Sequence, residues 1–410
     1  MPTLLQRLAG LAGVRARAPL AAPEAKQSAA GPLIAMQYQR QPVWSPRDYA
    51  SFAREGFAQN PIVYRSVRMI AEAAASVPVD LFAGDTEIED HPLLDLLRQP
   101  NPMQSRPDFL ESWYGFLLVA GNAYAEAVGA GPELRELYVL RPDRMTIVPG
   151  ADGWPLSYDY TVNGNSVNFT GDAVPGVRKV LHLPMFHPSN DYYGLSPIEA
   201  AATAIDIHNA ASAWNKAMLD NSALPSGALV FNSGDRQLTS EQYERLKSEL
   251  ETSFQGARNA GRPMLLEGGL DWRAMSMTPK DMDFIESKRQ AARDIATALG
   301  VPPMLLGIPG DLTHANFQEA NRGFWRHTVL PLVGRSMKAL SGWLSPAYGS
   351  GPLELRADLD GVEALSDERA ALWSRVGAAA FLTDAEKRAA VGYGNDPTSQ
   401  APQAEDAAAE

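Results

Sequence analysis

Two long helical segments separated by a short polar segment constrain the fold more than any other feature of the sequence. The first, residues 196–221, opens with Ser196-Pro197, a capping residue followed by a proline suited to the first helical position. The second, residues 279–299, follows Thr278 with the same kind of start. A helix of the first segment's length would span roughly 39 Å. The pattern predicts two long helices that hold a small module between them, although an ordinary core helix is the alternative interpretation of the alanine-rich first segment.

The segment between the two helices predicts a compact α+β module. Pro225-Ser226-Gly227 ends the first helix, and Thr239 with Gln242 forms the pattern of a capping box. The helix that follows is strongly polar, with one narrow apolar stripe. We expect a strand at 228–231, a helix at 239–254, and strands at 264–266 and 270–277 around Gly268-Gly269.

Residues 40–190 predict one α+β domain in which strands pair mostly with near neighbours in the sequence. The clearest element is a hairpin at 158–169, because Asn163-Gly164 supplies the positive φ values of a type I′ turn. Gly121-Asn122 is interpreted as a structural turn before a strand. We expect helices at 61–76, 91–97 and 108–118, and strands at 77–82, 122–128, 134–140 and 177–183.

The chain after the second long helix begins with a break at 300–310, which contains two adjacent prolines. A long helical window at 313–341 follows, and Pro331 is expected to bend or interrupt it because proline lacks an amide hydrogen. Thr383 with Glu386 carries the capping pattern of a last helix. We expect a strand at 353–359 and helices at 363–379 and 383–392.

Composition predicts disorder at both ends of the chain. Residues 1–32 are rich in alanine and proline, and residues 395–410 are rich in proline, glutamine, alanine and acidic side chains. The first stretch is interpreted as a mobile arm, with a weak amphipathic docking segment as the alternative. Arg7 interrupts its apolar start, so it lacks the core of a signal peptide. The sequence contains no apolar run long enough to predict a membrane-spanning helix.

The composition excludes several classes of chemistry. The chain has no cysteine, which excludes disulfides, thiolate nucleophiles and cysteine-bound metal clusters. It has 36 Lys and Arg against 48 Asp and Glu, a net charge of -12. A protein that grips DNA phosphates normally has a basic face, so if this chain meets DNA, it should meet it without holding it. The alternative is that the charge serves solubility alone.

The common catalytic motifs are absent from the sequence. It contains no GxxxxGK[ST], no GxSxG and no HExxH. His182 and His187 bracket a proline-containing loop, but no carboxylate has a convincing spacing to either. Asp281, Asp283 and Glu286 gather at the start of the second long helix, where acidic charge stabilises a helix N-terminus and could also line an acidic channel. We expect no metal and no cofactor.

Several segments occur in an order and spacing that carry a family resemblance. They are HPLLDLLRQPNP at 91–102, GNAYAEAV at 121–128, GLSPIEAAATAI at 194–205, PSGAL at 225–229, PMLLEGGLDW at 263–272, IATALGVPPMLLG at 295–307, and the helix with Asn316, Gln318 and Glu319. From about residue 60 to residue 392 the chain resembles the portal proteins of the HK97-type tailed phages. Its compact size further suggests a small particle, such as a gene transfer agent or a prophage-derived capsid.

The resemblance implies an α+β portal fold with a wing, a two-helix stem, an α+β clip insert and a small helical crown, assembled as a twelve-fold ring at one capsid vertex. The implied division of the chain is a disordered arm at 1–32, a wing at 33–195, stem helix 1 at 196–224, a clip at 225–278, stem helix 2 at 279–301, a tunnel loop at 302–315, a long helix and strand returning to the wing at 316–360, a crown at 361–394 and a disordered acidic tail at 395–410. Because the crown has little room, any pressure sensing by a crown is in doubt.

The resemblance also implies a structural role without enzymatic activity. Double-stranded DNA would pass through the channel without sequence-specific binding, in packaging and again in ejection, while a separate ATPase does the work. The implied partners are other copies of the chain, the major capsid protein, the terminase large subunit, the head–tail adaptor and DNA, with no membrane. The chain would assemble in the bacterial host cytoplasm and then occupy the capsid vertex.

Candidate site residues follow from position in this implied fold. The tunnel-loop and channel candidates are Asp311, Thr313, His314, Asn316, Asp281, Asp283 and Lys288. The clip candidates for contact with the motor or the adaptor are Arg236, Glu241, Glu244 and Arg245.

Two other functions stay open on the sequence alone. A soluble hydrolase-like enzyme would use His182 or His187, and it predicts a monomer or small oligomer with a concave site of converging polar groups. Another oligomeric head–tail connector would share the long helices but would lack the two-helix stalk with an inserted tip.

Overall fold

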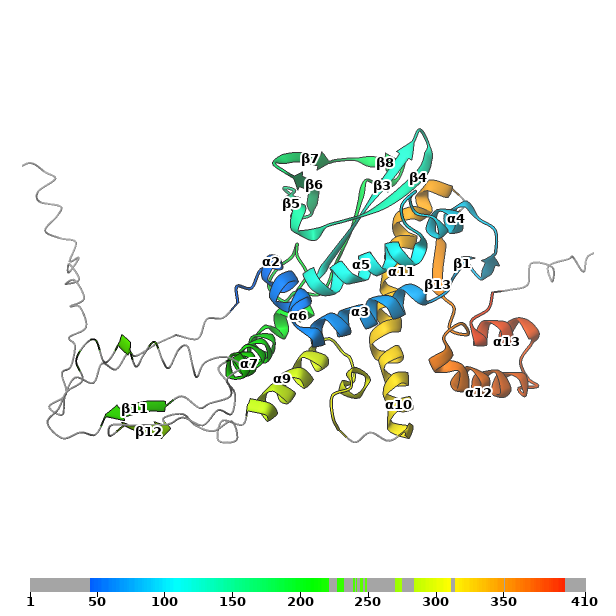
Figure 1. The fold of residues 1–410 in the computed structure, drawn as a ribbon. Coiled ribbons are helices and arrows are strands. Elements are labelled where there is room, and N and C mark those ends of the chain that lie inside the picture. Colours follow the sequence, from blue (N-terminus) through cyan, green and yellow to red (C-terminus); the bar gives the residue numbers. More distant parts are fainter. Residues whose placement is uncertain are drawn as a thin grey trace, which may run out of the picture. The chain divides into compact units, whose positions relative to one another are not determined.

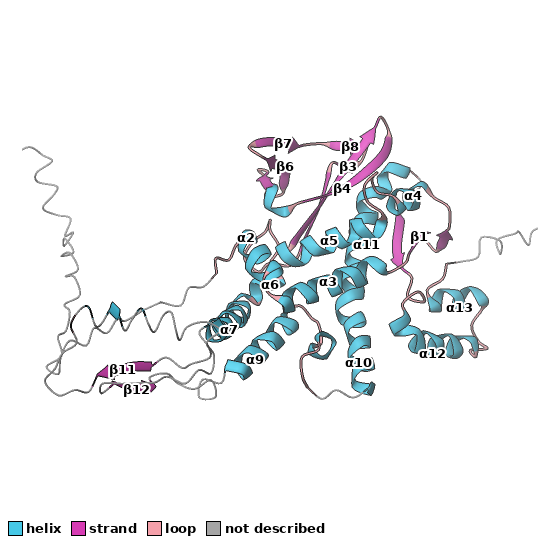
Figure 2. Cartoon of the chain, viewed as in Figure 1, coloured by secondary structure: helices cyan, strands magenta, loops and turns pink. Residues whose placement is uncertain are grey.

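A computed structural model describes residues 45–220, 227–231, 239, 241, 244, 245, 248, 270–274, 284–310, 314–349 and 351–394. Helices and strands occur in separate runs along these residues, in agreement with the expected α+β class. Figure 1 shows the order of the elements, and Figure 2 shows that the strands gather into separate small groups beside the helices. Among the described residues, no helix combines the length and apolar character needed to cross a membrane.

The main hydrophobic core lies between three helices. These are α3 (Pro61–Ser76), α5 (Arg106–Ala120) and α11 (Leu330–Leu344). Asn60 caps α3, since its side-chain oxygen accepts hydrogen bonds from two amides of the first turn. Trp113 of α5 is fully buried, and its indole Nε1 donates to Ser336 of α11 over 3.2 Å. The ring therefore contributes its large apolar area while its polar end stays satisfied.

Two three-stranded antiparallel sheets have the orders β10–β3–β4 and β5–β6–β7. Their bounds are β3 (Asn122–Ala130), β4 (Glu133–Leu140), β5 (Met145–Pro149), β6 (Pro155–Val162), β7 (Asn165–Phe169) and β10 (Val180–Pro184). The predicted hairpin is confirmed, because β6 pairs with β7 and Asn163 and Gly164 have φ values of 51° and 82°. The strand expected at 177–183 is split into β9 (Val177–Arg178) and β10. β5 was not among the strands predicted from the sequence.

A third sheet joins distant parts of the chain. It has the order β13–β1–β2, formed by β1 (Val79–Ala83), β2 (Thr86–Ile88) and β13 (Leu353–Ala357). Leu81 pairs with Leu355, and both are buried. The expectation of local strand pairing is wrong for this sheet. A two-stranded hairpin is marginal by itself, and the third strand supplies the missing partner from the far end of the chain.

The first long helix is interrupted near its start. α6 (Pro197–Ala200) and α7 (Ala202–Asp220) are separated at Ala201, where ψ is -1°, so the single helix expected at 196–221 is two helices. The second helix, α9 (Phe284–Ala298), packs against α7.

The ends of the insert between these helices come together as a strand pair. β11 (Gly227–Phe231) and β12 (Leu270–Ala274) are antiparallel, with Gly227 opposite Ala274. The expected strand at 264–266 lies outside the described residues, as do most of the residues of the expected helix at 239–254.

The long helical window near the C-terminal end contains the predicted interruption. α10 (His314–Phe324) continues into a π-helical turn, Trp325–Val329, and then into α11, where Pro331 occupies the first turn. Proline cannot donate a backbone hydrogen bond, and its ring crowds the carbonyl of the preceding turn. The wider π turn accommodates both effects, so the interruption lies in the turn before Pro331.

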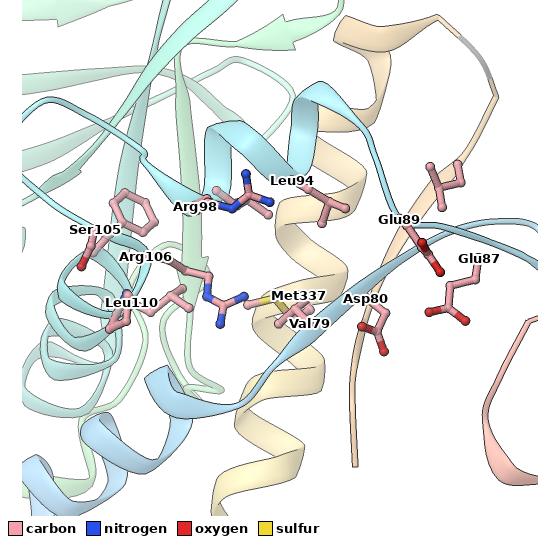
Figure 3. A pocket seen from close by; sticks show the side chains of 14 residues that line it. Val79, Asp80, Glu87, Glu89, Leu94, Arg98, Ser105, Arg106, Leu110 and Met337 are labelled. Carbon is pink, nitrogen blue, oxygen red and sulfur yellow. The ribbon is translucent and has the colours of Figure 1, made fainter. Parts of the chain in front are cut away.

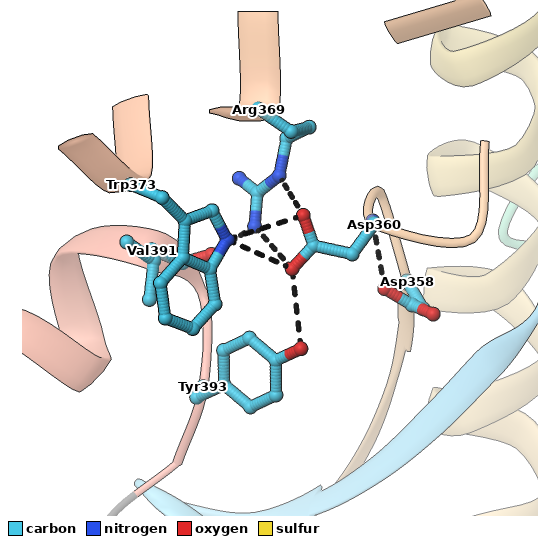
Figure 4. A network of polar contacts seen from close by, with 6 residues as sticks. All are labelled: Asp358, Asp360, Arg369, Trp373, Val391 and Tyr393. Carbon is cyan, nitrogen blue, oxygen red and sulfur yellow. Dashed lines mark hydrogen bonds and ion pairs between the residues drawn. The ribbon is translucent and has the colours of Figure 1, made fainter. Parts of the chain in front are cut away.

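Polar contacts hold the last two helices, α12 (Ser366–Gly377) and α13 (Asp384–Val391). The carboxylate of Asp360 accepts two hydrogen bonds from Arg369, at 2.5 and 2.9 Å, and further ones from Trp373 and Tyr393 (Figure 4). The hydrogen bonds from Arg369 are the main cause of the lowered pKa of Asp360. The predicted capping box of Thr383 is confirmed. One ionised carboxylate thus joins the loop after β13, α12 and the residues that follow α13.

The remaining elements are short. They are α2 (Tyr49–Ser51), a π-helical segment (Phe52–Ala58), α4 (Pro92–Arg98), β8 (Asp172–Val174), and 3-10 helices at Pro142–Arg144, Pro303–Leu306, Ser345–Tyr348 and Glu363–Leu365.

Candidate functional site

Two glycines from separate sequence segments meet backbone to backbone where the first sheet joins α6. Gly121 ends α5 with φ 69°, a left-handed conformation that favours glycine. A Cβ atom on Gly121 would lie 2.5 Å from the carbonyl oxygen of Gly194, and a Cβ atom on Gly194 would overlap the carbonyl oxygen of Gly121. Both positions therefore require glycine, and the two chain segments approach as closely as backbones can.

Asn122 fills the hydrogen-bonding needs of this contact. Its Oδ1 accepts from the amide of Gly194 over 2.8 Å, and its Nδ2 donates to the carbonyls of Ala120 and Gly194. Ser196 adds a second connection, because its hydroxyl donates to the carbonyl of Leu118 and accepts from the first turn of α6. We call Gly121, Asn122, Gly194 and Ser196 the junction. It fixes the start of α6 on the end of α5.

His182 completes the junction from β10. Its Nε2 lies 3.0 Å from Asn122 Oδ1, and because that oxygen is an acceptor, Nε2 carries the proton. Its ring stacks on Tyr124 at 4.3 Å and meets the edge of Tyr158. Burial lowers the pKa of His182 to about 4, so the ring is neutral near pH 7. These contacts give His182 a structural role.

The second histidine of the enzyme alternative has no catalytic partner either. His187 is half-buried, and its Nδ1 accepts from the amide of Ser189 over 3.1 Å. Among the described residues, neither His182 nor His187 forms a hydrogen bond or an ion pair with a carboxylate. Within the same part of the chain, no group of three His, Asp or Glu side chains is placed to hold a metal ion.

A cavity among the described residues also lacks a catalytic arrangement. It has a volume of about 660 Å³ and lies between the β1–β2 hairpin, α4, α5 and α11 (Figure 3). Asp80, Glu87 and Glu89 lie on one side, Arg106 on the other, and apolar side chains such as Met337 between them. Burial, followed by the charges of Asp358 and Glu87, raises the pKa of Asp80 to about 6. No histidine or serine–histidine pair lines it.

A second polar cluster attaches α7 to the start of α3. Asn60 is fully buried, and its Nδ2 donates to Asn209 Oδ1 over 2.9 Å and lies 3.2 Å from His208 Nδ1. Asn209 in turn donates to the carbonyl of Glu55 over 2.9 Å. Burial, with a smaller effect of Lys288 on α9, lowers the pKa of His208.

The channel candidates lie on or beside α9 and α10. Lys288 is half-buried on α9, close enough for its charge to act on His208 of α7. Asn316 is exposed in the first turn of α10, and His314 is the first residue of that helix. The predictions for Asp281, Asp283, Asp311 and Thr313 fall outside the described residues.

The clip candidates are only partly described. Glu241, Glu244 and Arg245 are exposed, and Arg236 falls outside the described residues.

The sequence matches a known protein family across most of the chain. The family model described as "Phage portal protein" matches residues 61–392. The chain belongs to the phage portal protein family. Portal proteins are structural, so the family assignment contradicts the soluble-enzyme alternative and confirms the resemblance drawn from the ordered segments.

Individual relatives support the same assignment. An uncharacterized protein of Rickettsia bellii is 40% identical over 340 residues, covering 82% of this chain and 88% of the relative. The portal protein of Enterobacteria phage HK97 is 27% identical over 354 residues, covering 83% and 80%.

Solved structures extend the match to a particle. A chain in the neck of an empty gene transfer agent particle is 55% identical, with a TM-score of 0.67, and the match covers 86% of this chain and 96% of that one. An HK97-family portal protein from Corynebacterium diphtheriae shares the fold, with a TM-score of 0.54 at 17% identity, over 74% and 94% of the two chains. The predicted portal fold and the link to gene transfer agents are confirmed.

The junction was not among the candidate sites drawn from the sequence. Gly121-Asn122 was interpreted as a structural turn, and the left-handed cap confirms that interpretation. The contact with Gly194 was missed, although GNAYAEAV and GLSPIEAAATAI were both among the segments that carry the family resemblance. Two such segments, each starting with glycine, were the available signal.

We expect Gly194→Ala to destabilise the fold strongly, because its Cβ would overlap backbone atoms that cannot move independently. The free energy of unfolding should fall by about 3 kcal/mol, the upper part of the range for overpacking. Urea unfolding measures this change. Gly115→Ala is the matched control, because a Cβ there meets nothing within 4 Å and lies in a helix, so it should be neutral or stabilising. Equal effects of the two substitutions would contradict the close contact.

We expect His182 to make the protein less stable as the pH falls from about 6.5 towards 4. The unfolded chain takes up the imidazole proton near pH 6.5, whereas the folded chain does so only near pH 4, so acid favours the unfolded state in this window. The loss attributable to His182 should reach about 2 kcal/mol. The measurement is the free energy of unfolding in urea at pH 7 and at pH 5. Between these two pH values, wild type should lose more of it than His182→Gln does. Parallel losses in the two proteins would show that His182 titrates normally.

Proposed function

We propose that this chain is the portal subunit of a gene-transfer-agent-like particle, forming a twelve-fold ring at one capsid vertex through which double-stranded DNA is packaged and ejected. The observation that carries the proposal is the 55% identity to a chain in the neck of a gene transfer agent particle, over 86% of this sequence. A further match, 54% identical with a TM-score of 0.64, comes from a neck of a native particle computed with C12 symmetry.

The implied division of the chain is part of the proposal, and several contacts support it. α7 and α9 pack together as a two-helix stem would, and β11–β12 closes the base of the insert between them. The junction joins this stem to the α+β region proposed as the wing. The helices α12 and α13 are the proposed small crown. The tunnel loop is proposed at 302–315, between α9 and α10.

The channel itself is proposed to guide DNA without gripping it. The net charge of -12 supports transit over binding, because an acidic wall repels a polyanion. Asp311, Thr313, His314 and Asn316 are the proposed residues of the narrowest point, with Asp281, Asp283 and Lys288 in the stem. Lys288 is the least favoured of these, because its charge acts on His208 and the side chain is half-buried.

The proposed partners are those a portal requires. The major capsid protein would surround the ring, and the terminase large subunit would supply the ATP-driven work that this chain lacks motifs for. The head–tail adaptor would follow the terminase at the clip, where Arg236, Glu241, Glu244 and Arg245 are the proposed contacts. Assembly is proposed in the bacterial host cytoplasm, before the ring occupies the capsid vertex.

We expect the purified chain, or the chain coexpressed with its capsid protein, to form closed rings with a central hole. Native mass spectrometry should give about twelve subunits, following the symmetry of the related neck, and negative-stain imaging should show the hole. Coexpression is included so that a ring that needs the capsid protein for nucleation is also detected. A protein that stays monomeric in both preparations would contradict the proposal.

We expect Asp311→Lys combined with His314→Trp to lower DNA packaging or retention while rings still form. A basic or bulky group at the narrowest point would bind phosphates or block the path. DNA protected from nuclease per purified particle measures the effect, and ring formation is checked by imaging. Asp367→Lys is the control, because the Asp367 side chain is 88% exposed on α12 and the charge change is the same. Normal DNA content in the double variant would show that the tunnel loop is placed wrongly.

A further inference from the structure

The second stem helix ends in a cap that turns the chain back on itself. Gly300 has φ 70°, its amide donates to the carbonyl of Thr297, and the amide of Val301 donates to the carbonyl of Ala296. This pair of hydrogen bonds is the Schellman arrangement, and the buried Val301 supplies its usual apolar contact. The chain therefore leaves α9 along a direction fixed by the helix itself.

After this cap, residues 302–310, which we call the connector, run back beside α9. Ile308 is 6% exposed and packs between Ala292 and Ala296, two small residues one turn apart on α9. The amide of Ile308 donates to the carbonyl of Pro303 over 3.2 Å, which closes the connector around its 3-10 helix. The connector thus returns past the last turn of the helix it has just left.

Arg293 holds the far end of the connector. Its Nη2 donates to the carbonyl of Pro309 over 2.7 Å, from a position one turn before Ala296. A charged donor makes this a stronger bond than one between neutral groups. Residue 310, the last described before α10, is therefore fixed beside the middle of α9.

The cap at Gly300 also contacts the long helix formed by α10, the π-helical turn and α11. Thr328, in the π-helical turn, donates through Oγ1 to the carbonyl of Gly300 over 2.6 Å. A Cβ atom on Gly300 would lie 2.8 Å from that Oγ1, so glycine is needed for the contact as well as for the turn. The turn just before the connector is held by the long helix through Gly300, and the end of the connector is held by Arg293.

We propose that Arg293 is a positioning residue, and that Ile308 in the notch between Ala292 and Ala296 assists it. Together they hold the connector, the first part of the proposed tunnel loop, against α9. This inference rests on the proposed function, because the connector lies within the proposed tunnel loop. Arg293 is assigned no contact with DNA. It acts through the carbonyl of Pro309, so that the connector moves with α9.

The local test uses the absence of cysteine from the chain. Ile308→Cys introduces a single buried thiol, whose labelling by a maleimide requires the connector to open. Adding Arg293→Ala should raise the labelling rate about fivefold to tenfold, the effect of losing one hydrogen bond to a charged group at a partly exposed site. Arg293→Lys, which keeps a cationic donor, should restore part of the protection. The cysteine itself could loosen the connector. Hydrogen exchange of residues 300–310 is therefore also measured in Arg293→Ala with Ile308 intact.

The matched control is Arg289→Ala, on the same helix one turn earlier. Arg289 is exposed and makes only an ion pair of 3.6 Å with Glu286 among its described contacts. Its removal should leave labelling and exchange unchanged. In particles, Arg293→Ala should lower retained DNA with normal ring formation, whereas Arg289→Ala should not.

The outcomes separate this inference from the proposed function. Unchanged labelling and exchange in Arg293→Ala would overturn the anchor, whatever the rings do. Faster labelling with normal rings and normal DNA content would overturn the positioning role. Absence of rings in the wild-type protein would instead contradict the proposed function. Faster labelling and lower DNA retention, both partly restored by lysine, would support the inference.

Discussion

The contact between Gly121 and Gly194 is the constraint on which the arrangement of the described chain depends. Neither position tolerates a Cβ atom, so the end of α5 and the residues before α6 meet through backbone alone. Such a contact buries amides and carbonyls, and burying them without partners would be costly. Asn122 removes that cost by serving both sides at once, with His182 oriented on the same oxygen. The junction therefore fixes the start of α6 relative to the first sheet, and the direction of α7, which follows α6, depends on it.

The parts of the fold differ in what holds them. α3, α5 and α11 share a large apolar core, whereas α12 and α13 are attached mainly by polar groups. Asp360 binds Arg369, Trp373 and Tyr393, and Glu368 forms ion pairs with Arg322 and Arg326 from the long helix. Exposed ion pairs contribute little stability, while an enclosed bidentate pair fixes geometry. The C-terminal helices are thus held in a defined orientation with a small stabilising free energy, which makes them the first part expected to open.

Local signals in the sequence predicted local structure well. Asn163-Gly164 gave the hairpin, Thr383 with Glu386 gave a cap, and Pro331 gave an interruption, because each acts within a few residues. The pairing of β1 with β13 and the Gly121–Gly194 contact were missed, because they join segments far apart in the sequence and no pattern within either segment specifies the partner. The family resemblance succeeded for a related reason, since the order of several segments reflects contacts that single segments do not show. The channel and clip candidates stay predictions, because they rest on position in an implied ring.

On the second stem helix, α9, the contacts of individual basic side chains matter as well as the net charge of the chain. α9 contains three basic residues, Lys288, Arg289 and Arg293, and the two arginines each have a polar contact within the chain. Arg289 pairs with Glu286, and Arg293 donates to the carbonyl of Pro309. A guanidinium committed to a carbonyl or a carboxylate binds a passing phosphate less readily than a free one. Net negative charge alone would leave individual cations able to hold DNA, and the engagement of these two arginines weakens that possibility for the described part of the helix. On the proposed function, free passage of DNA depends on how the basic residues of the stem are occupied as well as on the excess of acidic ones.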